Sequence, residues 1–202
     1  MSIDPRTPFS MTPDARAAGR VADLERRVAV LERGYSFLGA FAVGANALTF
    51  SDIPQNFRHL RVIFTMQSAR ASFQNTGAVA YINNQSSNYS YAVRYAAAPS
   101  GSATDSIGRG IARWYLGQCP AGSRANDNYV SAGEVLLPFY SATDRIHTYQ
   151  VKSGGDDGTN VLWVEGAGAY YGDTNPITRI DIRDDVSGNL GPRAKAELWA
   201  AP

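Results

Sequence analysis

A change of hydrophobic period at Gly34 divides the chain into two parts. Residues 20–34 follow a heptad pattern, with valine or leucine at the a and d positions and opposite charges at g and e. The a and d residues are Val21, Leu24, Val28 and Leu31, and the g and e residues are Arg20, Glu25, Arg27 and Glu32. Isolated helices shorter than about 12–15 residues are marginal in water, so this segment needs a partner. Because a g arginine meets an e glutamate of a neighbouring chain, the pattern predicts a parallel coiled-coil neck that joins identical chains.

The heptads leave two questions open. The same spacing fits an amphipathic helix that packs on the head of its own chain, although the ordered e and g charges favour the neck. Valine at a with leucine at d favours two strands in long coiled coils, but the domain that follows so short a neck can impose another number.

Residues 1–19 contain three prolines, Pro5, Pro8 and Pro13, in a short polar context. Such a segment is predicted to be extended and unable to bury itself. We interpret it as an anchor peptide that docks on a larger assembly, and a frayed terminus is the alternative. The start of the chain lacks the pattern of a signal peptide, and the sequence holds no run of 18 apolar residues. With Cys119 as the single cysteine, we expect synthesis in a reducing cytoplasm without membrane insertion.

From residue 35 to residue 202 the hydrophobic period is two, and turn residues separate the apolar segments. The segments expected to form strands are 35–43, 46–50, 59–67, 78–84, 89–95, 111–117, 128–140, 145–153, 161–171, 177–183 and 194–200. Residues 96–110, which are small and polar, are expected to form a long loop. Short strands with regular turns and no helical period are typical of sandwiches and barrels. We predict an all-β fold with a jelly-roll-like antiparallel β-sandwich head.

Charge and motifs favour a non-enzymatic protein. The net charge of +1 gives no electrostatic footprint for nucleic acid or for an acidic membrane. His59 and His147 are the only histidines, and neither lies near a serine or aspartate motif that would suggest a catalytic triad. The sequence contains no G-x-S-x-G, P-loop or H-E-x-x-H motif.

Two acidic clusters in the sequence are candidate sites. They contain Asp156 and Asp157 in one segment and Asp181, Asp184 and Asp185 in another. Carboxylate pairs serve glycoside hydrolysis, and Ca²⁺ takes six to eight oxygen ligands on a bent loop. Neither cluster follows a known calcium-loop pattern, and Gly-Asp-Asp-Gly is also a turn sequence. We favour the turn over calcium and calcium over catalysis, and we expect no metal and no cofactor.

Three loops combine tyrosine with asparagine or aspartate. They contain Asn83, Asn84, Asn88 and Tyr89 in the first, Asn126, Asp127, Asn128 and Tyr129 in the second, and Tyr170, Tyr171, Asp173 and Asn175 in the third. Aromatic rings can stack on sugars, amides and carboxylates can bond to sugar hydroxyls, and loops on a rigid scaffold often carry binding sites. These loops are candidates for binding a host cell-surface glycan, and the alternative is turn chemistry with tyrosines at strand ends.

Framework positions across residues 35–202 resemble a family of phage virion β domains that occur in minor tail proteins, tail fibres and capsid head fibres. An F-x-x-I-P-Q-x-F-x-H-L segment spans Phe50, Ile53, Pro54, Gln55, Phe57, His59 and Leu60. An asparagine-rich turn with a following tyrosine contains Asn83, Asn84 and Tyr89, and the closing strand pair contains Ile177, Ile180, Ile182, Gly191, Ala196, Leu198 and Trp199. The chain departs from the family where Trp199 and Ala200 replace Tyr-Gly, and where Asn83 and Asn84 replace Asn-Gly or Asn-Asp.

The resemblance implies a virion structural protein, and such proteins are commonly trimeric. We therefore expect a homotrimeric spike, fibre or decoration protein that residues 1–19 attach to a phage capsid or tail protein, with the head facing outward. The main alternative is a lectin-like adhesin that recognises host cell-surface glycans.

Overall fold

The computed structural model describes residues 34–42, 46–70, 76–98, 102–120, 129–156, 161–186 and 189–202. The chain divides into two compact units, Met1–Ser36 and Phe37–Pro202. The predicted anchor peptide 1–19 and residues 20–33 of the predicted neck lie outside the described residues. In the described part, no helix has the length and apolar character needed to cross a membrane.

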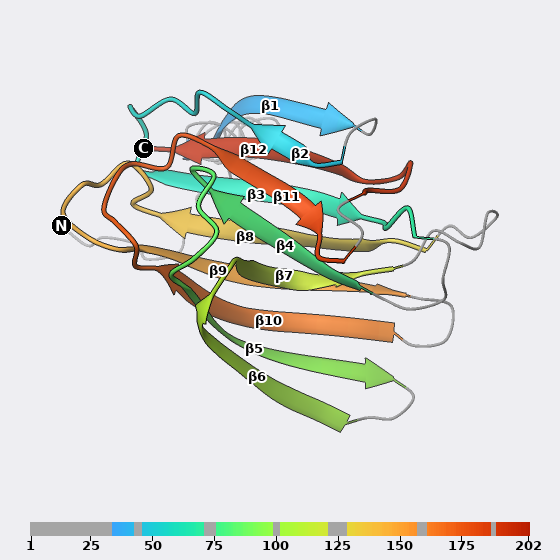
Figure 1. Cartoon of the computed structure of the whole chain (residues 1–202). Coiled ribbons are helices and arrows are strands. Elements are labelled where there is room, and N and C mark those ends of the chain that lie inside the picture. Colours follow the sequence, from blue (N-terminus) through green and yellow to red (C-terminus); the bar gives the residue numbers. More distant parts are fainter. Residues whose placement is uncertain are drawn as a thin grey trace, which may run out of the picture. The chain divides into compact units, whose positions relative to one another are not determined.

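Twelve strands occur in the described residues and form two antiparallel sheets (Figure 1). The larger sheet has the order β1-β12-β3-β8-β9-β10-β5-β6, and the smaller has the order β2-β11-β4-β7. The strands are β1 Ser36–Ala42, β2 Leu48–Phe50, β3 His59–Met66, β4 Thr76–Ile82, β5 Tyr89–Ala98, β6 Ser102–Ile111, β7 Trp114–Cys119, β8 Ser131–Pro138, β9 His147–Asp156, β10 Val161–Tyr170, β11 Ile180–Asp184 and β12 Lys195–Ala201. The predicted all-β sandwich is confirmed.

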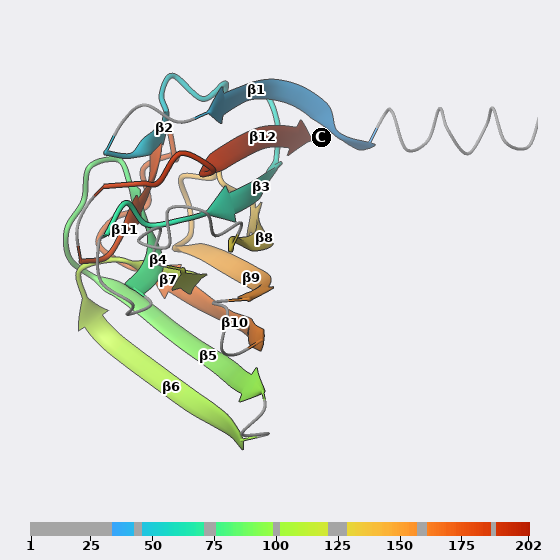
Figure 2. The same ribbon diagram turned by 90° about the vertical axis from the view of Figure 1, so that its right-hand side faces the viewer.

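The alternation of buried and exposed residues in β3 explains how the two sheets pack against each other. Leu60, Val62, Phe64 and Met66 are all buried, while the residues between them are exposed or half-buried. Side chains two residues apart point to the same face of a strand, so this row faces the smaller sheet. It shares one core cluster with apolar side chains of the smaller sheet, which are Leu48, Phe50, Ala78, Ala80, Ile82, Trp114, Leu116, Cys119, Ile180 and Ile182. Figure 2 shows the smaller sheet against one face of the larger sheet.

The prediction of a long loop at residues 96–110 is wrong. β5 continues to Ala98, and β6 begins at Ser102 and pairs antiparallel with it, with Tyr95 opposite Thr104. Alanine, glycine, serine and aspartate have low β propensity, but such propensities give way to packing and pairing. Here β5 is fixed in the core by the buried side chain of Val93. Residues 102–111 form a strand because they pair with β5 along its length.

An aromatic cluster fills the space between β7 and the larger sheet. The Trp114 ring centroid lies 4.7 Å from that of Tyr149 and 5.6 Å from that of Tyr89, and Tyr89 lies 5.1 Å from Tyr170. Gly168 in β10 makes room for this layer, since an added Cβ would come within 2.3 Å of the Tyr149 ring. The backbone carbonyl oxygen of Ser90 on β5 would lie even closer, at 2.1 Å, so both neighbouring strands require a glycine here.

Candidate functional site

Two of the three predicted sugar-contacting loops meet at one end of the sandwich. The Asn83 side chain accepts hydrogen bonds from the backbone N–H groups of Thr178 (2.9 Å) and Arg179 (3.2 Å) and donates one to the Pro176 carbonyl (2.9 Å). The Tyr171 N–H donates to the Asn88 carbonyl at 3.0 Å. The amide of Asn83 thus fastens the β4–β5 turn to the segment between β10 and β11, which is a structural role.

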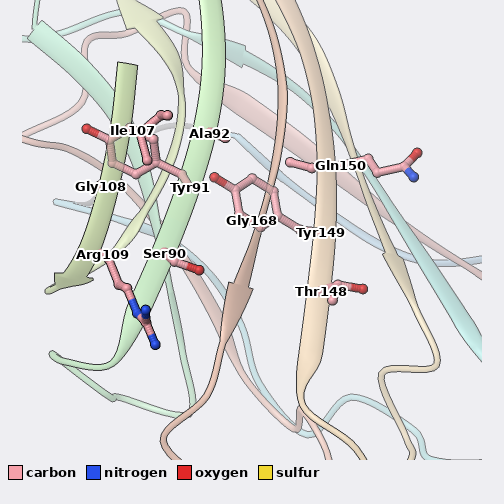
Figure 3. Close-up of a pocket in the computed structure, with 11 residues that line it drawn as sticks. Ser90, Tyr91, Ala92, Ile107, Gly108, Arg109, Thr148, Tyr149, Gln150 and Gly168 are labelled. Carbon is pink, nitrogen blue, oxygen red and sulfur yellow. The ribbon is translucent and has the colours of Figure 1, made fainter. Parts of the chain in front are cut away.

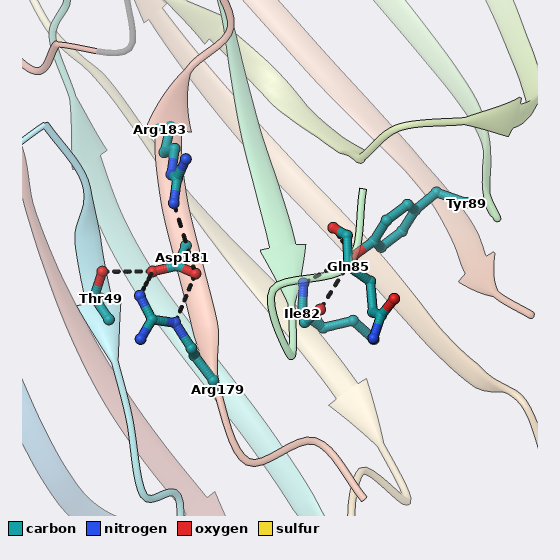
Figure 4. Close-up of polar contacts among 7 residues, drawn as sticks. All are labelled: Thr49, Ile82, Gln85, Tyr89, Arg179, Asp181 and Arg183. Carbon is teal, nitrogen blue, oxygen red and sulfur yellow. Dashed lines mark hydrogen bonds and ion pairs between the residues drawn. The ribbon is translucent and has the colours of Figure 1, made fainter. Parts of the chain in front are cut away.

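Tyr89 and Tyr170 do not belong to a sugar-contacting surface, which corrects the prediction for both. Their exposed fractions are 0% and 2%, and their rings lie in the aromatic cluster. The Tyr89 hydroxyl accepts from the Ile82 N–H at 2.9 Å and donates to the Gln85 carbonyl at 3.1 Å (Figure 4). Each tyrosine hydroxyl reaches a polar partner at the edge of the core, which is how a buried tyrosine avoids an unsatisfied donor.

The remaining loop residues have different environments. Asn84 and Asn88 are exposed and adopt positive φ angles, a backbone region that asparagine enters more readily than most residues. Tyr171 is 37% exposed. Asp173 is half-buried and accepts hydrogen bonds from the Tyr170 hydroxyl at 3.0 Å and from the Asn175 N–H at 2.9 Å.

The loop that contains Tyr129 lies at the opposite end of the sandwich. Tyr129 precedes β8, whose first residue Ser131 pairs with Met66 at the end of β3. The first loop instead lies at the end of the sandwich where β3 begins, since the Tyr140 N–H bonds to the Arg58 carbonyl and the Ile177 N–H to the Tyr140 carbonyl. Asn126, Asp127 and Asn128 lie outside the described residues. The structure therefore brings two predicted loops together and separates Tyr129 from them.

A shallow groove of about 440 Å³ lies on the outer face of the larger sheet, across β9, β10, β5 and β6 (Figure 3). Its floor consists of short side chains, including Ala92 and Ala167. Taller side chains flank the floor, Ile107 on β6 and Gln150 on β9. From the sequence, the signal for Thr148 and Gln150 is the alternation in β9, where their neighbours are buried and they therefore lie on the outer face. The sequence gives no such signal for Ile107, because its segment is expected to form a loop.

A smaller cavity of about 220 Å³ lies where β6 and β7 meet. Tyr91 and Tyr115 line it together with an ion pair between Arg113 and Asp185. The Tyr115 hydroxyl accepts a hydrogen bond from Gln118 at 2.9 Å. These polar groups already have partners within the chain, so the cavity shows no group that is directed at a ligand.

A buried charge lies on β11, where the side chain of Asp181 is 0% exposed. Arg179 donates two hydrogen bonds to it, at 2.8 and 2.9 Å, and Thr49 donates a third at 2.5 Å (Figure 4). Arg183 lies 3.9 Å away and stacks over the Tyr81 ring. Burial alone would raise the pKa of Asp181, but the hydrogen bonds from Arg179 and Thr49 and the two guanidinium charges outweigh burial and lower the pKa.

Asp181→Asn is expected to lower the free energy of unfolding at neutral pH by about 1–3 kcal/mol, because hydrogen bonds to a charged group are lost. An aspartate whose pKa is lowered in the folded state contributes stability above its unfolded pKa of about 3.9. That contribution is lost as the pH falls through the folded pKa. Urea unfolding at neutral and acidic pH should show a weaker acid dependence in the variant. Asp144→Asn is the control, since Asp144 forms an exposed pair with Arg145.

Neither acidic cluster forms a metal site within the residues that the structure describes, where no three His, Cys, Asp or Glu side chains come together suitably. In the second cluster, Asp181, Asp184 and Asp185 point to different partners. Asp184 accepts hydrogen bonds from the Ser68 hydroxyl and from the Val186 N–H, while Asp185 pairs with Arg113. Asp157 of the first cluster lies outside the described residues.

Comparisons with known proteins give no family. No family model matches the chain, and no curated protein matches it. A solved structure of a protein of unknown function from Shewanella oneidensis MR-1 aligns over 96% of this chain and 97% of that chain, with 6% sequence identity and a TM-score of 0.24. A score this low supports no argument about the fold or the function.

Proposed function

We propose that this protein is a structural component of a bacteriophage virion, a homotrimeric spike, fibre or decoration protein without catalytic activity. The observation that carries the proposal is the order of segments, with a proline-containing peptide at 1–19, heptads at 20–34 and a β-sandwich after them. Residues 1–19 attach to a capsid or tail protein, the neck gathers the chains, and the head faces outward, where it can contact the host.

The sheet topology supports the finer assignment of a jelly roll. If the edge strand β1, its neighbour β12 and the inserted hairpin β9–β10 are set aside, the remaining strands lie in the orders β2-β11-β4-β7 and β3-β8-β5-β6. The chain then crosses between the sheets at every connection except the β5–β6 hairpin. Eight strands connected in this way form the two Greek keys of a jelly roll.

The test is the mass in solution, measured by light scattering on the full chain and on a version that begins at Tyr35. A trimer of the full chain is expected. A trimer of both versions would place the main interface in the head, which is a compact unit by itself from Phe37 onward. A monomeric full chain would contradict the spike and favour a helix that packs on its own head.

The second candidate is a lectin-like adhesin, which the joined loops at one end of the head favour. Asn84, Asn88 and Tyr171 are exposed there on a rigid scaffold. A glycan array probed with the assembled protein should then give signals that Tyr171→Ala abolishes and that Trp163→Ala, at an exposed aromatic residue of the β10 strand, preserves. An array without signals would count against the adhesin and leave the spike unaffected.

A further inference from the structure

β6 is an open edge of the larger sheet. It stands at the end of the strand order, and within the described residues it pairs with β5 alone. With ten residues it is longer than the other terminal strands, β1 with seven, β7 with six and β2 with three. An open edge presents unpaired N–H and C=O groups to which another strand can pair, and proteins usually protect such an edge with charges or bulges.

The outward side chains of β6 are self-complementary. Asp105, Ile107 and Arg109 alternate along the strand, so they lie on the same face. Ile107 is 81% exposed, the most exposed large apolar side chain among the described residues. One negative and one positive residue stand at equal spacing on either side of it.

We propose that β6 pairs antiparallel with β6 of a second copy of this chain, in the two-fold register that sets Ile107 opposite Ile107. In this register each Asp105, which accepts two hydrogen bonds from Arg94 of its own chain at 2.8 and 3.1 Å, also lies opposite Arg109 of the other copy. Each carboxylate then stands between two arginines, and the contact contains two cross-strand ion pairs. Opposite charges on directly opposed residues stabilise antiparallel strands, and like charges destabilise them. The exposed isoleucines then cover one another at the centre.

Charge selects this register over its neighbours. A slip of the two-fold axis by two residues in one direction sets Asp105 opposite Asp105, and a slip in the other direction sets Arg109 opposite Arg109. A slip of the axis by one residue sets each Ile107 opposite a charged residue, Asp105 in one direction and Arg109 in the other, and no two opposite charges then stand directly opposed. Asp105 and Arg109 therefore disfavour pairing with a strand that lacks matching charges and favour pairing with a second copy of β6.

The contact is short, and this limits its strength. Gly110, with a φ of +71°, lies where the β5–β6 register shifts, so regular pairing is confined to residues 105–109. An interface this small is weak by itself. A two-fold contact joins chains in pairs, so in the proposed trimeric spike it joins one spike to another, and only in a dimeric assembly would the neck raise the effective concentration of the two strands.

The test is disulfide cross-linking of the full chain that carries Ile107→Cys. Directly opposite residues of antiparallel strands have Cα atoms about 4.5–5.5 Å apart, within the range of disulfides. Cys119 does not interfere, because it is buried and its burial raises the pKa of its thiol. Gln150→Cys is the matched control, an exposed position in the same row of the outer face but three strands from the edge.

After mild oxidation, a denaturing gel without reductant should show a severalfold excess of covalent dimer for Ile107→Cys over Gln150→Cys. Adding Arg109→Asp should abolish the excess, and Arg109→Lys, which keeps the charge, should preserve it. Equal cross-linking at 107 and 150, or a dimer that Arg109→Asp leaves unchanged, would overturn the proposal. The contact goes beyond the proposed virion role, and light-scattering mass reports that role separately, so either can fail alone.

Discussion

Trp114→Ala is expected to lower the free energy of unfolding of the head by about 3–5 kcal/mol. Trp114 is 1% exposed, and its ring lies against Tyr89 and Tyr149, so the substitution leaves a cavity between β7 and the larger sheet. The indole Nε1 makes no hydrogen bond within the described residues. The loss is therefore one of packing and not of a polar contact. A loss of this size is a large fraction of the roughly 5–15 kcal/mol that stabilises a typical domain.

The measurement is urea unfolding of the full chain, followed by far-ultraviolet circular dichroism because the signal must not depend on tryptophan. Trp163→Ala is the matched control, since it removes the same side chain from a site that is 41% exposed. A much smaller loss is expected there, because an exposed ring leaves no closed cavity. Equal losses in the two variants would show that the aromatic cluster is not the centre of the core.

The fold was predictable where alternation is regular. In β3 every second residue is apolar, and the structure buries Leu60, Val62, Phe64 and Met66 as expected. The β5–β6 hairpin was not predictable, because residues 96–110 carry few large apolar side chains to mark a strand. Pairing with a neighbouring strand supplies what the local sequence lacks, and pairing is a long-range property.

The candidate site was less predictable than the fold. Tyr89 and Tyr171 both adjoin asparagine-containing turns, yet one is fully buried and the other is 37% exposed. A tyrosine carries an apolar ring and a polar hydroxyl, so it fits a buried or an exposed position. Which of the two it takes depends on how deeply the end of its strand lies in the sandwich. Asn83 similarly fits a sugar or a backbone, and here the backbone of residues 176–179 takes its amide. Ile107 gains its importance only from a position on an open edge, which depends on the sheet order.

Leu24→Ala combined with Leu31→Ala is expected to convert the oligomer to single chains. Both leucines occupy d positions of the predicted neck, and each buried Leu→Ala substitution typically costs about 2–5 kcal/mol. A neck of two heptads has no further apolar layers to replace the lost contacts, and helices shorter than about 12–15 residues are marginal without a partner. Light scattering of the full chain should show the mass of one protomer, with the far-ultraviolet circular dichroism of the head retained.

Val30→Ala is the matched control, because Val30 is apolar but falls at a c position, away from the seam. It should leave the mass unchanged, which ties the effect to the heptad register and not to apolar content. A double variant that stays assembled would contradict the neck as the main interface and assign the oligomer to the head. In that case the heptads would serve only to align residues 1–19 for attachment.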